Sequence, residues 1–339
     1  MPTMPDDKQL YRLLPDVEVV RRSNTLMLVS SGSGAAVRIS PAAEALLPLL
    51  EAGTSVDELQ TALQEKHPQA RDINSKLTVF LQPLVRSGLL TVGNQSKRKR
   101  KGWPKLELFQ PDPLAAVCAA LLLKPPALVR RTLLAVLLLG SLAGIVQLIL
   151  MHRFPSPHQI FDAVGIPGFF IFFLVVVPIH EAAHAIACRM AGIEVGAAGI
   201  ILHGNLMPGP YIETTKAYRV QNRIARFWIP AAGPIINLLG TGIAAWLLIW
   251  LDPHRVEAVE ITQTVFFLCA VFVYLDTNPF GPSDGSHMVE ALLEDELARR
   301  NAWSFRKLRD FDQYTAVRYR WACVVHMLLA IVAMYFWIR

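Results

Sequence analysis

Residues 167–191 read PGFFIFFLVVVPIHEAAHAIACRMA, and this stretch decides how the rest of the chain is interpreted. It is long enough and apolar enough to cross a membrane, since a helix of about 20 apolar residues spans the hydrocarbon core of a bilayer. Three ionisable residues, His180, Glu181 and His184, follow an otherwise apolar run from 163 to 179. Ionisable groups at such a depth are costly and usually mark a functional site.

The same stretch contains the pattern His-Glu-x-x-His. His180 and His184 are four residues apart and share one face of a helix, so both imidazoles can bind one Zn²⁺. Glu181 lies one residue further round, where its carboxylate can take a proton from a water activated by the metal. The pattern also recurs by chance, and the alternative is a helix end that emerges into water with all three side chains solvated. The apolar surroundings favour the metal site.

Four further stretches are predicted to span a membrane, at 132–151, 224–251, 261–275 and 321–338. With 167–191 they predict an α-helical polytopic membrane protein of about five transmembrane helices. The composition agrees, because 53% of residues are apolar and only 18% are charged, which excludes a wholly soluble enzyme. Long continuous apolar runs also exclude an outer-membrane barrel, whose strands alternate polar and apolar residues.

Lysine and arginine are unevenly distributed between the two sides of these spans. With the N-terminus inside, the segments 97–131, 189–226 and 285–320 carry 21 of them, against three in the outer segments. The positive-inside rule therefore predicts a cytoplasmic N-terminal domain and an external C-terminus. The first eight residues show no signal-peptide pattern, so we expect no cleaved signal.

Two short segments are expected to meet the membrane surface. The basic run KRKRK at 97–101 is expected to lie on the cytoplasmic leaflet, and the alternative is a solvated linker. The apolar segment 114–123 is too short to span a bilayer, which favours an interfacial helix.

A catalytic zinc site needs a third protein ligand and an open position. The candidate is Asp284, in the segment NPFGPSDG at 278–285, which follows the fourth predicted span. Irregular backbone at membrane depth is tolerated only beside protein or a wet cavity. The second and fourth spans run in the same direction, so both motifs lie toward the cytoplasmic side. One alternative is a surface turn capped by Asp284. Another is His287 as the third ligand, although we expect this side chain to be exposed or to contact a ligand rather than the metal.

Residues 8–95 predict a small α+β domain. Strand-like runs at 16–22, 25–30 and 35–40 are separated by turn sequences at 23–24 and 31–34. Three helices follow: one from Ser40-Pro41 to Gly53, one at 56–66 opened by a capping box of Ser55 and Glu58, and one at 72–86 that Pro83 should bend or shorten. A closing strand at 88–92 completes a winged-helix-like module.

The metal motif and its surroundings resemble the site-2 protease family of intramembrane zinc metalloproteases. The resemblance rests on His-Glu-x-x-His in one span, GPIIN at 233–237 in the next, and the segment 278–285. Residues 105–339 are more narrowly similar to bacterial peptide zinc metalloproteases, through 210–219 and a Leu-rich helix expected over 284–302. This resemblance implies His180, His184 and Asp284 as zinc ligands, Glu181 as acid/base, and Asn237 as a polar group that faces the site. Ser283 departs from the family, which usually carries Leu there.

Residues 8–95 resemble the PqqD family, which recognises ribosomally made, modified peptides. The resemblance rests on the three strands, ISP at 39–41, GTSVDEL at 53–59 and SGLL at 87–90. It implies that a leader peptide adds as a strand beside 35–39, against the third helix. The alternative is another winged-helix module. A nucleic-acid partner is disfavoured, because Lys76 and Arg86 are the only bases of the third helix.

The two halves together predict a zinc metalloendopeptidase of the bacterial cell (inner) membrane that matures a peptide. Residues 96–131 are then a basic linker and interfacial segment, and 132–339 the catalytic domain in the lipid bilayer. A tethered peptide-binding domain would raise the local concentration of precursor near the zinc site. Two alternatives stay open: a regulatory site-2 protease that cuts a membrane-bound regulator, and a non-catalytic membrane partner in peptide binding or export. The sequence does not predict an oligomeric state.

Overall fold

The computed structural model describes residues 9–21, 26–30, 36–66, 73–93, 105–155, 158, 165–203, 207–304 and 310–338 of the 339-residue chain. The chain divides into two compact units, Met1–Trp103 and Pro104–Arg339. The predicted turns at 23–24 and 31–34 and the basic run at 97–101 lie outside the described residues.

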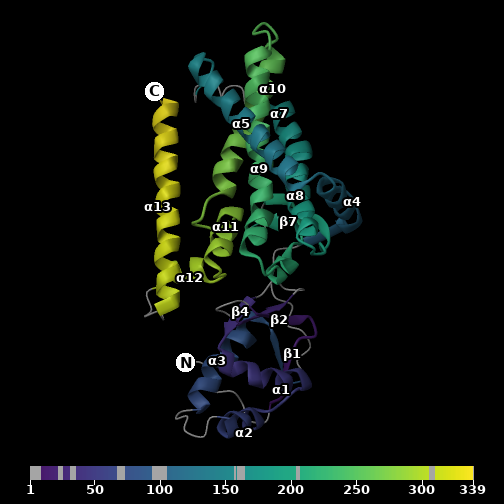
Figure 1. The fold of residues 1–339 in the computed structure, drawn as a ribbon, viewed down its shortest axis with the longest axis vertical. Helices are drawn as coiled ribbons and strands as arrows, with labels where there is room; N and C mark the ends of the chain where they lie inside the picture. Colours follow the sequence, from purple (N-terminus) through teal and green to yellow (C-terminus); the bar gives the residue numbers. More distant parts are fainter. Residues whose placement is uncertain are drawn as a thin grey trace. The chain divides into compact units, whose positions relative to one another are not determined.

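The first unit contains two small antiparallel sheets (Figure 1). One has the order β2-β3-β4, with β2 at Val17–Arg21, β3 at Leu26–Ser30 and β4 at Ala36–Ile39. The other pairs β1 (Tyr11–Leu13) with β5 (Leu90–Val92), which joins the beginning of the unit to its end. The strands β2, β3, β4 and β5 confirm the predicted runs. The strand β1 was missed, because three residues carry too short a pattern to detect.

The helices of the first unit follow their predicted boundaries closely. They are η1 (Pro41–Leu46) and α1 (Leu47–Ala52), then α2 (Val56–Lys66) and α3 (Ile73–Ser87). The Ser40 hydroxyl accepts a hydrogen bond from the Ala43 amide, and Ser55 and Glu58 form the predicted capping box. The helix α3 continues through Pro83 rather than being shortened by it. Packing explains this result, because the apolar face of α3 lies in the core and outweighs the loss of one main-chain hydrogen bond.

The first unit has a hydrophobic core of its own. Leu28 of β3, Leu50 of α1, Leu59 of α2 and Leu84 of α3 are all fully buried in one cluster. Each of these four elements therefore contributes to the same core.

The second unit is mostly helical (Figure 1). Among its described residues, five helices have the length and apolar composition of membrane spans. They are α5 (Ala127–Leu150), the continuous helix Ile166–Met190, α9 (Arg223–Trp250), α10 (Val256–Asp276) and α13 (Asp310–Ile338). The continuous helix consists of α7 (Ile166–Ile171), the π-helical turn η2 (Phe172–Val176) and α8 (Val177–Met190). The number of predicted spans is thus confirmed.

Three predicted spans begin earlier than expected. The helix α5 starts at Ala127 rather than 132, so it includes the charged pair Arg130 and Arg131. The helix α10 starts at Val256 rather than 261, and α13 starts at Asp310 rather than 321. Both helices begin with a polar turn, so each helix starts before the apolar run that predicted it. The helix α11 (Asp284–Leu293) is shorter than the single helix expected over 284–302, because Glu294 adopts a left-handed conformation with φ 54°. The helix α12 (Ala298–Ala302) follows as a separate element.

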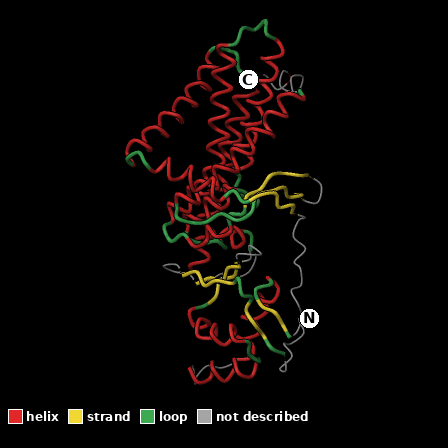
Figure 2. The backbone as a smooth tube through the Cα atoms, turned by 90° about the vertical axis from the view of Figure 1, so that its right-hand side faces the viewer, coloured by secondary structure: helices red, strands yellow, loops and turns green. Residues whose placement is uncertain are grey.

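The helix α9 lies at the centre of the second unit. It contacts α5, α8, α10 and α11. In Figure 1 α5 crosses this group of helices at an angle, and Figure 2 shows the helices of the unit turned by 90°. Because α8, α10 and α11 carry or adjoin the candidate ligands, α9 is the element that packs against all parts of the candidate site.

A short helix and a three-stranded sheet complete the second unit. The helix α4 (Asp112–Leu123) occurs where an interfacial helix was expected, and its place at a membrane surface stays a prediction. The carboxylate of Asp112 pairs with Arg189 at 2.9 Å and accepts a hydrogen bond from the Val195 amide, which fixes α4 to the end of α8.

The sheet has the order β6-β7-β8, with β6 at Lys105–Phe109, β7 at Ala198–His203 and β8 at Met207–Ile212. No pattern in the sequence predicted this sheet. The strand β8 carries two prolines and a glycine, and the pairing of β6 with β7 joins distant parts of the chain.

Candidate metal centre

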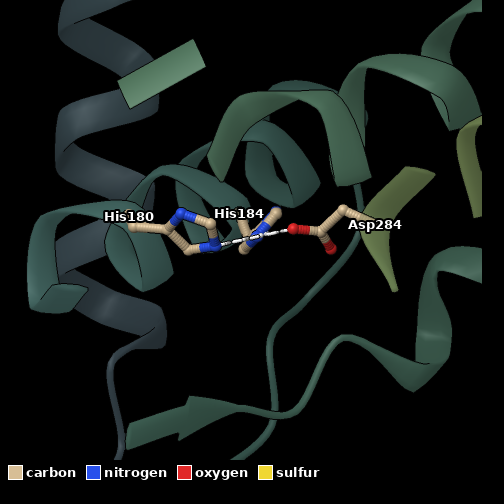
Figure 3. Close-up of side chains that lie close together, drawn as sticks. All are labelled: His180, His184 and Asp284. Atoms are coloured by element: carbon tan, nitrogen blue, oxygen red, sulfur yellow. Dashed lines mark hydrogen bonds and ion pairs between the residues drawn. The ribbon is translucent and has the colours of Figure 1, made fainter. Parts of the chain in front are cut away.

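The helix α8 presents two histidines one turn apart on the same face. His180 and His184 are both 8% exposed, and their Nε2 atoms lie 3.1 Å from each other. Figure 3 shows both imidazoles pointing toward the carboxylate of Asp284. The i and i+4 spacing in the sequence therefore produces the convergence that it predicts.

Asp284 reaches the histidines from the first turn of α11. Its Oδ2 lies 3.5 Å from Nε2 of His180 and 3.3 Å from Nε2 of His184 (Figure 3). Ser283 is the N-cap of α11, and it forms a capping box with Ser286. The residue that departs from the family pattern thus begins the helix that presents Asp284.

These three side chains form a cluster whose donor atoms fit a tetrahedral metal. A zinc ion binds His nitrogen and carboxylate oxygen at about 2.0–2.2 Å, which places tetrahedral ligand atoms about 3.3–3.5 Å apart. The observed separations of 3.1, 3.3 and 3.5 Å match this requirement. Among the described residues, His180, His184 and Asp284 are the one group of three or more such side chains whose donor atoms could hold a metal ion together. Their assignment as ligands stays a prediction.

The helix α9 covers the histidine pair with its backbone. A Cβ atom placed on Gly233 would lie 2.4 Å from Nε2 of both His180 and His184, so only glycine allows this approach. One turn earlier, the Ile229 carbonyl lies 2.7 Å from Nδ1 of His184. This contact orients the His184 ring with Nε2 toward the cluster. In the GPIIN segment, Gly233 thus leaves room for the two imidazole rings.

Asn237 faces the site, as the sequence analysis expected. It is 1% exposed, and its Nδ2 lies 3.1 Å from Nδ1 of His180. The same Nδ2 donates a hydrogen bond of 2.7 Å to Oδ2 of Asp276, the last residue of α10. The sequence analysis did not identify Asp276 as a site residue. The available signal was a carboxylate at the end of an apolar span, eight residues before Asp284.

Glu181 is held by the end of the strand β8. The main-chain amide of Ile212 donates a hydrogen bond of 3.1 Å to the Glu181 carboxylate. The neighbouring residue Glu213 bonds in both directions to the segment before β7, through Gly196 and Ala197. The Ile212 amide therefore points away from β7, toward α8, and the sheet that the sequence analysis missed positions the predicted acid/base.

The segment between α10 and α11 is irregular, as predicted, and is fixed by several hydrogen bonds. The Ser283 hydroxyl donates to the Asn278 carbonyl, and the Asn278 side chain accepts from the Phe280 amide at 2.9 Å. The buried Tyr319 hydroxyl of α13 donates to the Pro279 carbonyl at 2.6 Å. Asn278 therefore has a local role in the backbone of this segment, and α13 supports the turn that precedes Asp284.

His287 does not join the cluster. Its Nδ1 lies 3.0 Å from Oε2 of Glu290 on the next turn of α11, and its side chain is 47% exposed. Of the two candidates for the third ligand, Asp284 is the one that the structure brings to the histidines.

The carboxyl group of Asp284 has a lowered pKa. Burial by itself would raise its pKa, and the hydrogen bonds and charges of His180 and His184 outweigh that effect. The charged carboxylate is the form that binds a metal, whereas the histidines must be neutral to bind it, so metal binding would release protons from this cluster.

A comparison with protein families covers the part of the chain that carries the two histidines. The family model of Peptidase family M50 matches residues 168–275, which include His180, Glu181, His184 and Asn237. This match supports a metalloprotease of the site-2 protease type. The chain is 35% identical over 74 residues to the uncharacterized protein MJ0971 of Methanocaldococcus jannaschii, a match that covers 22% of this chain and 20% of that protein. The matched part thus spans about a fifth of this relative's length. No solved structure matches the chain significantly.

Proposed function

We propose that this chain is an intramembrane zinc metalloprotease that cleaves a precursor peptide delivered by its N-terminal unit. The observation that supports the proposal most strongly is the His180–His184–Asp284 cluster, whose donor atoms have the spacing of a tetrahedral zinc site. The two histidines and the aspartate would hold the ion and leave a fourth position open for water or substrate.

The chemistry follows from the residues around the cluster. A bound zinc ion supplies Lewis acidity, which polarises a peptide carbonyl and activates a water. Glu181, on the same helix as the histidines, takes the proton from the attacking water and gives it to the leaving amine. Asn237 holds a polar side chain beside His180, where it can orient the ring or a substrate carbonyl.

The strand β8 offers a way to bind an extended substrate. It is the last strand in the order β6-β7-β8, so one of its edges has no partner strand among the described residues. That edge meets the acid/base, because the Ile212 amide points to Glu181. The outward-facing positions of this edge are Pro208, Pro210 and Ile212. Prolines have no N–H and the Ile212 amide is bonded to Glu181, so an extended peptide would meet this edge by donating to its carbonyls, close to the proposed zinc site.

The first unit is proposed to be a PqqD-like domain that binds the leader of a ribosomally made, modified peptide. The strand β4 is the last strand in the order β2-β3-β4, has one partner strand among the described residues, and packs against α3. A leader peptide would add beside β4 by main-chain hydrogen bonds, with side-chain contacts to α3 for specificity. Leader removal or peptide maturation is then the reaction that the second unit performs.

The proposed location is the bacterial cell membrane, with the first unit in the cytoplasm. The five apolar helices support a multi-pass membrane protein. The excess of Lys and Arg in the segments 97–131, 189–226 and 285–320 supports the orientation. A cytoplasmic first unit would meet a newly made precursor before any export step.

The test uses the full purified chain, loaded with zinc, and a precursor peptide encoded next to it. Glu181→Gln retains size and polarity but cannot carry the proton. It should bind zinc as the wild type does and cleave the precursor about 10²- to 10⁴-fold more slowly. Near-normal cleavage by the zinc-loaded variant would contradict the protease mechanism.

A further inference from the structure

The inner end of α10 places a second carboxylate next to the histidine pair. Asp276 is the last residue of this helix, and its side chain is 21% exposed although a charged group could turn to solvent at a helix end. Its Oδ2 instead lies 2.7 Å from Nδ2 of Asn237 and 3.7 Å from Nδ1 of His180. The three side chains come from α8, α9 and α10, so this contact connects three helices behind one imidazole.

The two ring nitrogens of His180 have different neighbours. Its Nε2 faces the cluster, at 3.1 Å from Nε2 of His184 and 3.5 Å from Asp284. A metal in the proposed site would therefore use Nε2, and Nδ1 would carry the ring proton and need an acceptor. For His184 the acceptor is the Ile229 carbonyl, 2.7 Å from Nδ1. For His180 the groups at this position are two side chains, Asn237 and Asp276.

The hydrogen-bond partners of Asn237 make Asp276 the group that attracts the Nδ1 proton, through its charge at 3.7 Å rather than through a hydrogen bond. The Asn237 Nδ2 group already donates to Asp276, and an amide NH₂ cannot accept a proton from Nδ1. The Asn237 Oδ1 atom is buried and has no hydrogen-bond partner among the described residues. A negatively charged acceptor behind a metal-binding histidine fixes the ring and increases the basicity of the coordinating nitrogen.

We propose that Asp276 is a positioning residue for His180. Its carboxylate, held by the Asn237 amide, places a negative charge beside Nδ1, keeps the ring proton on that nitrogen, and so leaves Nε2 toward the metal. This inference rests on the zinc site proposed above. Asp276 itself is not a ligand, because its carboxylate lies on the opposite side of the imidazole from Asp284 and His184.

The test measures zinc affinity in the full chain, purified in detergent, by competition with a chromogenic chelator. Asp276→Asn removes the charge and preserves the size of the side chain. Loss of a partner that supports a metal ligand typically weakens metal binding about 10- to 100-fold, and we expect a loss in this range. Glu260→Gln is the matched control, since it removes one negative charge from an exposed position on the same helix, and it should leave zinc affinity unchanged.

Two further readouts separate positioning from general stability. The absorption spectrum of bound Co²⁺ reports ligand geometry, and it should change in Asp276→Asn but not in Glu260→Gln. The thermal midpoint of the metal-free chain should be similar in both variants. Asn237→Ala removes the amide that holds the Asp276 carboxylate and should also weaken zinc binding. Combining it with Asp276→Asn should cost less than the sum of the single losses.

The outcomes distinguish this inference from the proposed function. Suppose that the wild type binds zinc and that His180→Ala abolishes this binding. If the zinc affinity of Asp276→Asn is then within about 2-fold of the wild-type affinity, the proposed role of Asp276 is wrong and the zinc site stands. If the wild type binds no stoichiometric zinc, both are overturned. Should Asp276→Asn fail to fold, Asn237→Ala decides, and unchanged zinc affinity in that variant overturns the proposal.

Discussion

Gly233→Ala tests the packing of α9 over the candidate zinc site. The added Cβ would lie 2.4 Å from Nε2 of both His180 and His184, and 2.5 Å from Cε1 of His180. Ordinary van der Waals contact begins at 3.4 Å, so the methyl group overlaps both ligand atoms by about 1 Å. Helix propensity favours alanine over glycine by about 1 kcal/mol, so any loss must come from this overlap.

The expected effect on metal binding is large because the site tolerates little movement. Zinc–ligand distances in proteins vary by about 0.2 Å, whereas the rings must move by several times that amount to accept the methyl group. We expect Gly233→Ala to weaken zinc binding at least about 100-fold, together with an overpacking cost of about 1–3 kcal/mol in the free energy of unfolding. Chelator competition measures the first effect, and thermal unfolding of the metal-free chain measures the second.

Two glycines provide matched controls for this substitution. A Cβ on Gly140 of α5 meets nothing within 4 Å, so Gly140→Ala should bind zinc normally. A Cβ on Gly242, on the same helix α9, would lie 2.4 Å from Cα of Ser141, so Gly242→Ala should destabilise the α5–α9 contact without selective loss of zinc. If Gly233→Ala binds zinc within about 3-fold of the wild type, the close packing of α9 on the histidines is not as described.

Three further predictions concern other parts of the chain. Tyr319→Phe leaves the Pro279 carbonyl without its donor, so it should lower the free energy of unfolding by about 1–3 kcal/mol and speed zinc dissociation. Tyr314→Phe, at an exposed position of α13, should do neither. Equal effects in both variants would argue against a supporting role for α13. Hydrogen bonds from Thr54 and Ser55 hold the pKa of Glu58 below its ordinary value of 4.5, so the stability that they contribute is present above about pH 4.5 and is lost as the pH falls through the folded-state pKa. The fragment 1–103 should therefore lose thermal stability below that pH more steeply than its Glu58→Gln variant, and parallel pH profiles would contradict this. Titration calorimetry should show that the same fragment binds the cognate leader, and excess leader should inhibit cleavage by the full chain. If residues 104–339 alone cleave the precursor as fast as the full chain does, the precursor is recognised elsewhere.

The sequence predicted the parts of this structure that depend on local patterns. The boundaries of α2 follow from its capping box, and the helical spacing of His180 and His184 brings both imidazoles to one side of α8. The five spans follow from apolar length. These features depend on residues close together in the chain, so one sequence is enough to detect them.

The parts that the sequence did not predict depend on contacts between distant segments. The sheet β6-β7-β8 joins residues near 105 to residues near 200, and no local alternation marks β8. The position of Asp276 behind His180 depends on how α10 packs against α9, which a periodic pattern does not contain. The choice of Asp284 over His287 could be argued from resemblance, and the structure gives the geometric reason, since α11 begins at Asp284 and turns His287 toward Glu290.

X-ray absorption at the zinc edge of the purified full chain tests the central claim most directly. The account predicts about one zinc per chain, bound only by nitrogen and oxygen at about 2.0–2.2 Å, with two imidazole ligands and no sulfur. Asp284→Ala should remove most of this zinc, whereas His287→Ala should retain it. Sulfur ligands at about 2.3 Å, or full zinc occupancy in Asp284→Ala, would contradict the assignment of His180, His184 and Asp284 as the metal site.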